Sequence, residues 1–117
     1  MRVTEVYYPG SPPVEGYGPG FFRVGGMVHT GAVALLPKGP VGWAGLVDPA
    51  PILEQAAAID VLLIGMGAEI RALDRDLRAL LEAAGIGVEI MATPPACRTY
   101  NVLLGEGRRV AAALLPV

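Results

Sequence analysis

The side chain best suited to covalent chemistry in this sequence is the thiol of Cys97, the only cysteine. It falls in the first turn of a helix expected over residues 93–104, and the dipole at a helix N-terminus lowers the pKa of a thiol. A nucleophilic cysteine also needs a base, and His29 is the only histidine. The alternative is structural, because Cys97 lies at the edge of the apolar face of that helix, where small buried cysteines are common. We favour the structural interpretation.

A second candidate site is Gly65-Met66-Gly67, which follows an apolar run typical of a buried strand. A dinucleotide-binding fingerprint begins at such a place, but Ile70 stands where the third glycine of that pattern belongs. The sequence therefore favours a tight turn, in which a glycine adopts a positive φ or lies close to a neighbouring segment. The alternative is a small ligand bound over the end of the strand.

The last expected helix begins at Thr93 as its N-cap, with Pro94 at the first helical position. Pro94 and Pro95 lack an N–H, and the Thr93 hydroxyl is expected to accept from the amide of residue 96, so this turn offers an anion few free donors. Arg98 and Asn101 are expected to point away from the apolar face of this helix. On that outward side they could bind a carboxylate or the backbone of a partner. The alternative is that they form a solvated face or cap a nearby loop. The candidate ligand- or partner-binding residues are therefore Gly65, Gly67, Thr93, Cys97, Arg98 and Asn101.

Other catalytic and metal-binding chemistry has little support. The only serine, Ser11, has no Gly-x-Ser-x-Gly around it, and no pair of carboxylates is brought together by the sequence. One cysteine and one histidine exclude a zinc site of the multi-cysteine kind. We expect no metal, no cofactor and no catalytic residue. Glu106 is expected to form an ion pair with Arg108 or with Arg98 on the surface.

Composition limits the classes of partner. A chain of 117 residues is about one domain, and we expect a single domain over 1–117. The net charge of -2 and pI of about 5.3 argue against nucleic acid as a partner. The longest weakly charged stretch, 24–47, is interrupted by Lys38, prolines and glycines, so we expect no membrane insertion. The first residues show no apolar signal segment, and we expect a cytoplasmic protein.

The elements that position the candidate residues follow from periodicity and turn signals. Two apolar runs, 21–24 and 27–36, flank Gly25-Gly26 and predict an antiparallel β-hairpin. The rest of the chain alternates strands and helices, which predicts parallel strands within a mixed sheet flanked by helices. The expected helices are 51–58, 71–84 and 93–104, and the expected strands are 61–64, 86–91 and 109–115.

Three segments together resemble one known family. They are Gly85–Leu103, reading GIGVEIMATPPACRTYNVL, then Glu106–Leu114, reading EGRRVAAAL, and Leu62–Gly67, reading LLIGMG. The sequence resembles the Mth-type domain family, long described as a domain of unknown function, over nearly the whole chain. Its eukaryotic relatives include an adipogenesis-associated protein and a mitochondrial complex I assembly factor. The resemblance implies a three-layer α/β fold with a mixed central sheet and no established enzyme activity.

The sequence departs from the pattern of this family in two respects. Ala92 stands where an acidic residue is expected before the threonine, and no mitochondrial presequence is seen, which is typical of a prokaryotic member. The first functional hypothesis is a non-enzymatic binding or accessory protein, an assembly factor for respiratory complex I with a protein partner. The alternative is a small-ligand-binding protein or enzyme whose site lies at the strand ends, near Gly65, Gly67, Thr93 and Arg98.

Overall fold

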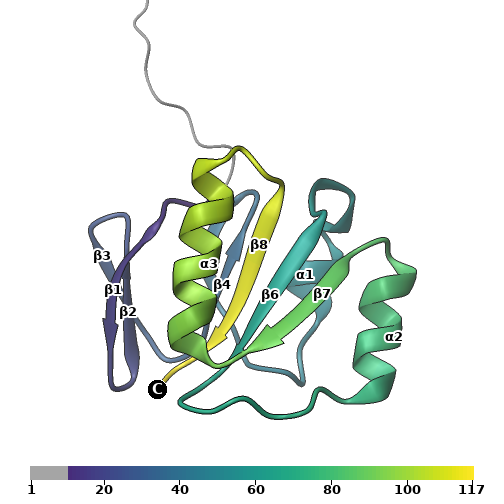
Figure 1. Ribbon diagram of the computed structural model, residues 1–117, viewed down its shortest axis with the longest axis horizontal. Coiled ribbons are helices and arrows are strands. Elements are labelled where there is room, and N and C mark those ends of the chain that lie inside the picture. Colours follow the sequence, from purple (N-terminus) through teal and green to yellow (C-terminus); the bar gives the residue numbers. More distant parts are fainter. Residues whose placement is uncertain (1–10) are drawn as a thin grey trace, which may run out of the picture.

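The computed structural model describes residues 11–117, in which a five-stranded mixed sheet forms the centre (Figure 1). The strand order is β5-β4-β8-β6-β7. β6 runs parallel to β7 and to β8, whereas β4 runs antiparallel to β8 and β5. The predicted mixed sheet is confirmed. Its strands are β4 (Val33–Leu36), β5 (Gly39–Gly42), β6 (Val61–Met66), β7 (Gly87–Met91) and β8 (Val110–Leu115).

A second, three-stranded antiparallel sheet stands at one end of the molecule (Figure 1). It consists of β1 (Val14–Gly18), β2 (Phe21–Val24) and β3 (Met27–Thr30). Gly25 and Gly26 form the two-residue turn between β2 and β3, with φ of 60° and 79°. Both turn positions need a positive φ in this hairpin, which glycine adopts without steric cost. The predicted hairpin turn is therefore confirmed.

The predicted strand over 27–36 is wrong, because this run forms two strands in different sheets. The chain changes direction at Gly31, whose φ is 85°, and passes from β3 into β4. Pro37 and Lys38 then form the turn between β4 and β5. Pro40 lies within β5, opposite Leu35. A proline is tolerated there because β5 is an edge strand.

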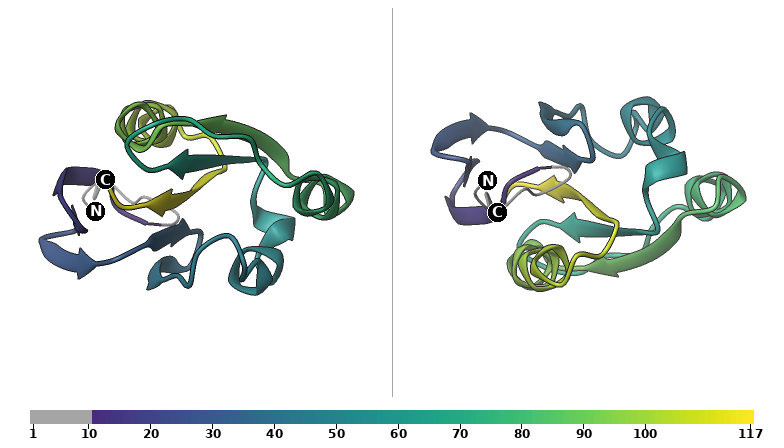
Figure 2. Two further views of the ribbon diagram at one scale, coloured as in Figure 1. Left: turned by 90° about the horizontal axis from the view of Figure 1, so that it is seen from below. Right: turned by 90° about the horizontal axis from the view of Figure 1, so that it is seen from above.

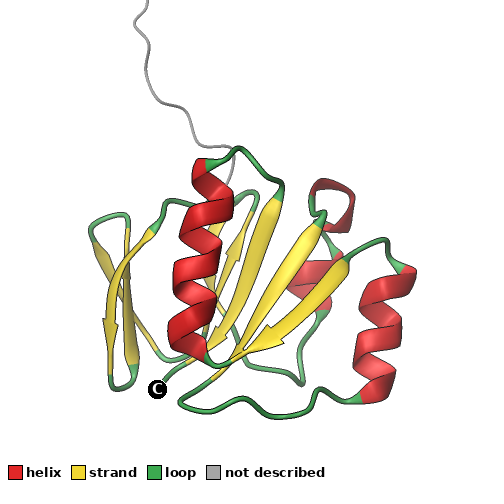
Figure 3. Ribbon diagram, in the orientation of Figure 1, coloured by secondary structure: helices red, strands yellow, loops and turns green. Residues whose placement is uncertain are grey.

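Helices cover both faces of the central sheet (Figures 2 and 3). α3 (Thr93–Gly105) and the three-stranded sheet pack on one face, and α1 (Ala50–Leu53) and α2 (Arg75–Ala83) pack on the other. Alternate residues of each central strand face opposite layers, as a pleated strand requires. In β8, Ala112 and Leu114 face α3, whereas Ala111 and Ala113 face the layer of α1 and α2. This is the three-layer α/β domain that the resemblance implied.

Two predicted helices are shorter in the structure. The segment 51–58 forms only α1 and a separate 3₁₀ turn at Ala56–Ala58. The segment 71–84 becomes helical only from Arg75, because the Asp74 carboxylate accepts a hydrogen bond from the Leu77 amide at 3.0 Å and caps α2. An N-cap residue lies outside the helix that it begins. The residues before Asp74 therefore belong to the loop that follows β6.

Candidate functional site

Gly65, Gly67 and Thr93 meet at the carboxyl end of β6, as the alternation of strands and helices suggested. The Thr93 hydroxyl accepts a hydrogen bond from the Gly67 amide at 2.8 Å and donates one to the Leu115 carbonyl at 2.6 Å. The Thr93 amide donates to the Gly67 carbonyl at 2.8 Å. One buried side chain thus joins the end of β6, the end of β8 and the start of α3. We call this set of contacts the Thr93 junction.

The glycine at position 65 permits the close packing of this junction. A Cβ atom on Gly65 would lie 2.8 Å from the Thr93 Oγ1 and 3.0 Å from the Thr93 Cα. Gly67 is required for a different reason, since its φ is 94°. These are the two roles that the sequence predicted for glycines at this turn, a close approach and a positive φ. Both glycines therefore allow α3 to pack closely against the end of β6.

The expectation that Thr93 is the N-cap and accepts from the amide of residue 96 is wrong. The N-cap is Ala92, and its carbonyl accepts from the Ala96 amide at 3.1 Å. Thr93 is the first helical residue, and its hydroxyl bonds to strand ends distant in the sequence. The exposed fraction of Thr93 is 0%, so neither its amide nor its hydroxyl faces solvent.

Cys97 lies one turn further along α3 and faces the core, with an exposed fraction of 3%. Burial raises the pKa of the Cys97 thiol from 9.0 to about 11, and the charge of Arg98 offsets only part of this rise. Desolvation of the thiolate therefore outweighs the favourable end of the helix. The structural interpretation of Cys97 has the stronger physical support.

We expect Cys97 to react slowly with a maleimide in the folded protein. A pKa raised from 9.0 to about 11 lowers the thiolate fraction at pH 8 about 100-fold. The measurement compares alkylation rates at pH 8 in buffer and in a denaturing concentration of urea. The unfolded chain is the control, since its thiol is free of burial. Equal rates in the two solutions would restore Cys97 as a candidate nucleophile.

Arg98 and Asn101 have different surroundings. Arg98 is exposed, and nothing in the described part of the chain forms an ion pair with it. Asn101 bonds twice to the backbone of Val14: its Oδ1 accepts from the Val14 amide at 2.8 Å, and its Nδ2 donates to the Val14 carbonyl at 2.9 Å. Asn101 therefore binds a backbone segment, as one of the alternatives expected, but the segment is β1 of the same domain and not that of a partner.

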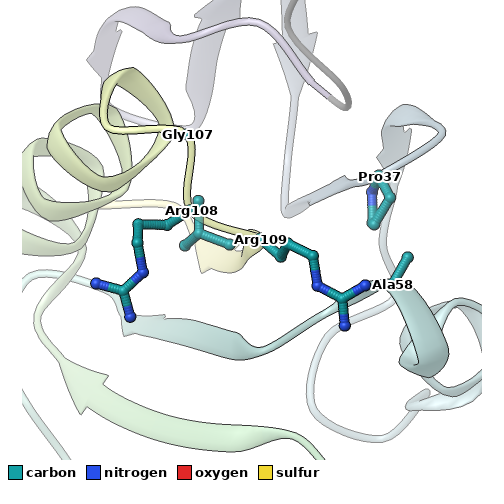
Figure 4. A pocket seen from close by; sticks show the side chains of 6 residues that line it. Pro37, Ala58, Gly107, Arg108 and Arg109 are labelled. Atoms are coloured by element: carbon teal, nitrogen blue, oxygen red, sulfur yellow. The ribbon is translucent and has the colours of Figure 1, made fainter.

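The structure also contains a hollow of about 170 Å³ at the amino end of β8 (Figure 4), which the sequence analysis missed. It lies at the opposite end of the central strands from Gly65 and Gly67. The Arg108 and Arg109 side chains point to opposite sides of it (Figure 4). The sequence signal for this hollow is the pair of adjacent arginines that follows Gly107, in the turn after α3. The lining residues are Pro37, Ala58, Gly107, Arg108, Arg109 and Val110.

Arg109 is held at one side of this hollow by an ion pair. Its Nη2 donates to the Asp60 Oδ1 at 3.0 Å and to the Ala57 carbonyl at 3.1 Å. The Arg109 guanidinium lowers the pKa of the Asp60 carboxyl, chiefly through this hydrogen bond. The predicted pairing of Glu106 with Arg108 or Arg98 is not found among residues 11–117. Glu106 instead caps the end of α3, just before the chain turns at Gly107.

Within residues 11–117, no three His, Cys, Asp or Glu side chains gather in a way that would hold a metal ion. Among the helices of that same part of the chain, none has the length and apolar character needed to span a membrane.

The mixed sheet, its two helical layers and the Thr93 junction define a small three-layer α/β domain. The family model for a protein of unknown function, DUF498/DUF598, matches residues 14–115. The chain belongs to this family. An uncharacterised protein of Rhodobacter capsulatus is 47% identical over 117 residues, which cover 100% of this chain and 94% of that protein.

A second group of relatives carries a functional name. NADH dehydrogenase (ubiquinone) 1 alpha subcomplex assembly factor 3 of Danio rerio is 32% identical over 111 residues, covering 88% of this chain. The match covers 63% of that assembly factor, so this chain spans less than two thirds of its length. The human assembly factor of the same name is 31% identical, with 88% of this chain and 60% of that protein covered.

Solved structures share the fold. A crystal structure described as an outer membrane protein from Bartonella henselae has a TM-score of 0.85 and 41% identity, and the match covers 93% of this chain and 98% of that one. A solution structure of a Bordetella pertussis protein, described as a Mth938-like domain, has a TM-score of 0.77 and 30% identity, with 99% and 91% covered. The Mth-type resemblance of the sequence is confirmed.

Proposed function

We propose that this protein is a cytoplasmic, prokaryotic accessory factor that binds a protein partner during the assembly of respiratory complex I. The observation that carries the proposal is the similarity to assembly factors of that complex, which extends over 88% of this chain. Identity of about one third over such a length is compatible with a shared surface as well as a shared fold.

The geometry of the candidate residues supports binding over chemistry. Thr93 and Asn101 use their polar atoms for contacts within the domain. Cys97 is buried, and its raised pKa disfavours the thiolate. Of the candidate side chains, only that of Arg98 is exposed to solvent. An exposed arginine on a rigid helix suits recognition of a carboxylate on a partner.

The alternative is a small-ligand or enzymatic site at the strand ends near Gly65, Gly67, Thr93 and Arg98. It draws on the rule that open α/β sheets bind ligands beyond the carboxyl ends of their strands. The close packing of Gly65 against Thr93 leaves a ligand no room between β6 and α3. A ligand there would have to lie outside this junction, against Arg98.

The test is a deletion strain of the source organism, with its membranes resolved on a native gel and stained for NADH dehydrogenase activity. We expect the fully assembled complex to fall at least several-fold and smaller subcomplexes to accumulate. A plasmid copy of the wild-type gene should restore the full complex. Normal levels of complex I in the deletion strain would refute the assembly role.

A further inference from the structure

Within residues 11–117 the two sheets present four strand edges, and three of them carry a feature that hinders pairing. The Val14 amide and carbonyl of β1 are both taken by the Asn101 side chain, which occupies the place of a further strand. β5 carries Pro40, and β7 carries the exposed carboxylate of Glu89. Side-chain caps, prolines and charges are the devices by which proteins prevent pairing at strand edges.

The fourth edge, β3, has none of these devices. Its sequence, Met27–Thr30, contains no proline, acidic residue or lysine, and among residues 11–117 it pairs only with β2. Met27 is 65% exposed and Val28 is 53% exposed. An edge strand with free backbone groups and exposed apolar side chains is a template for pairing with another strand.

The register shows which backbone groups of β3 point away from β2. Val24 and Met27 flank the two-residue turn and are therefore a hydrogen-bonded pair. Bonded and non-bonded pairs alternate in an antiparallel ladder, so Met27 and His29 bond to β2. The amides and carbonyls of Val28 and Thr30 consequently point away from β2, toward the open edge.

The side chains beside this edge indicate what would bind there. Val28 lies opposite Arg23 in the ladder, so the two side chains share one face of the sheet. Arg23 is exposed and has no acidic partner among residues 11–117. Met27 lies on the other face, next to the buried Val24. A strand added to β3 would therefore meet an unpaired cation on one face and an apolar side chain on the other.

We propose that the β3 edge binds an extended segment of a partner protein in which acidic and apolar residues alternate. The backbone of the segment pairs with Val28 and Thr30, its apolar residues pack against Met27, and its carboxylates reach Arg23. A second copy of this chain is a poorer occupant, because β3 brings no carboxylate to Arg23. This edge site depends on the proposed function in one respect only, namely that the binding partner is a protein.

The probe is a synthetic peptide, Thr-Val-Glu-Val-Glu-Val-Thr with blocked ends, titrated to millimolar concentration into ¹⁵N-labelled protein. We expect saturable amide shifts that are largest at Val28 and Thr30. A peptide with lysine in place of glutamate should bind about two- to fivefold more weakly, the effect of one exposed ion pair. Absence of shifts at β3, or equal binding of the two peptides, would overturn the proposal.

Variants at one position separate edge pairing from general surface binding. Val28→Pro should abolish binding yet fold, because the Val28 amide makes no bond to β2 and the proline removes only the outward donor. Val28→Thr is the matched control, since it keeps the amide and the branched shape, and should bind within about twofold of wild type. Val28→Glu is a second edge-blocking change, to be used if the proline variant unfolds, because a carboxylate beside Arg23 pairs with it and repels the glutamates of the peptide. Undiminished binding by a folded edge-blocked variant would contradict the proposal.

Two outcomes test the occupant and the link to complex I separately. Concentration-dependent dimerisation in sedimentation, lost in Val28→Pro, would make a second copy the occupant and refute the partner segment. In the deletion strain, Val28→Pro should fail to restore complex I, whereas Val28→Thr should restore it. If both variants restore the complex, the edge proposal fails and the assembly role stands. If the peptide binds but deletion leaves complex I normal, the assembly role fails and the edge site stands.

Discussion

Thr93→Val should lower the free energy of unfolding by about 3 kcal/mol, because it leaves a buried amide and a partly buried carbonyl without their partner. Valine has nearly the shape of threonine but lacks the hydroxyl that accepts from the Gly67 amide and donates to the Leu115 carbonyl. Each unpaired buried group costs about 1–3 kcal/mol. The measurement is urea unfolding followed by the fluorescence of Trp43, the only tryptophan.

Two variants serve as controls for the Thr93 junction. Thr99→Val removes a hydroxyl from the same helix, at a half-buried position that makes no side-chain hydrogen bond within residues 11–117, and should change stability by less than about 0.5 kcal/mol. Thr93→Ser keeps the hydroxyl and should recover most of the loss. If Thr93→Val is as stable as wild type, the two hydrogen bonds do not hold α3 to the strand ends.

Gly65→Ala should also destabilise the fold, by about 2–3 kcal/mol, through overpacking. The added Cβ would meet the Thr93 Oγ1 at 2.8 Å, the Thr93 Cα at 3.0 Å and the Leu114 Cδ2 at 3.0 Å. The Leu114 side chain can move aside, but the Cα of Thr93 belongs to the helix backbone. α3 must therefore shift away from β6, which weakens the hydrogen bonds of the junction as well. The same urea titration measures the loss.

The matched control is Gly105→Ala, which adds the same methyl group to the end of α3. A Cβ at Gly105 meets nothing within 4 Å, and the position has no positive φ. Alanine in place of glycine should raise stability here by up to about 1 kcal/mol, because it reduces the entropy of the unfolded chain. A similar loss for both alanine variants would show that the close approach at Gly65 is not the cause.

Features set by short stretches of sequence were predictable in this chain. The turn at Gly25-Gly26 depends on two backbone conformations that glycine adopts readily, and the burial of Cys97 follows from helical spacing. The run 27–36 was misjudged because its composition does not show that the chain leaves one sheet for another within it. Only the backbone at Gly31 marks that change.

The partners of polar side chains were not predictable, because they are distant in sequence. A local rule assigned the Thr93 hydroxyl to the amide of residue 96, whereas it bonds to Gly67 and Leu115. Asn101 could be placed on an outward helix face, but its contact with Val14 spans 87 positions. Such contacts depend on the topology of the sheets. The sequence singled out Gly67, Thr93 and Asn101 without showing that they use their polar atoms for hydrogen bonds inside the domain.

The middle strand of the central sheet, β8, is the last strand along the described chain. During synthesis, β4 with β5 and β6 with β7 emerge from the ribosome as two separate pairs, and neither has a completed apolar layer. Only the arrival of the alanine-rich β8 joins them, and it does so through contacts of high sequence separation, which form slowly. The apolar faces of β4 and β6 therefore stay uncovered in the nascent chain until β8 has left the ribosome.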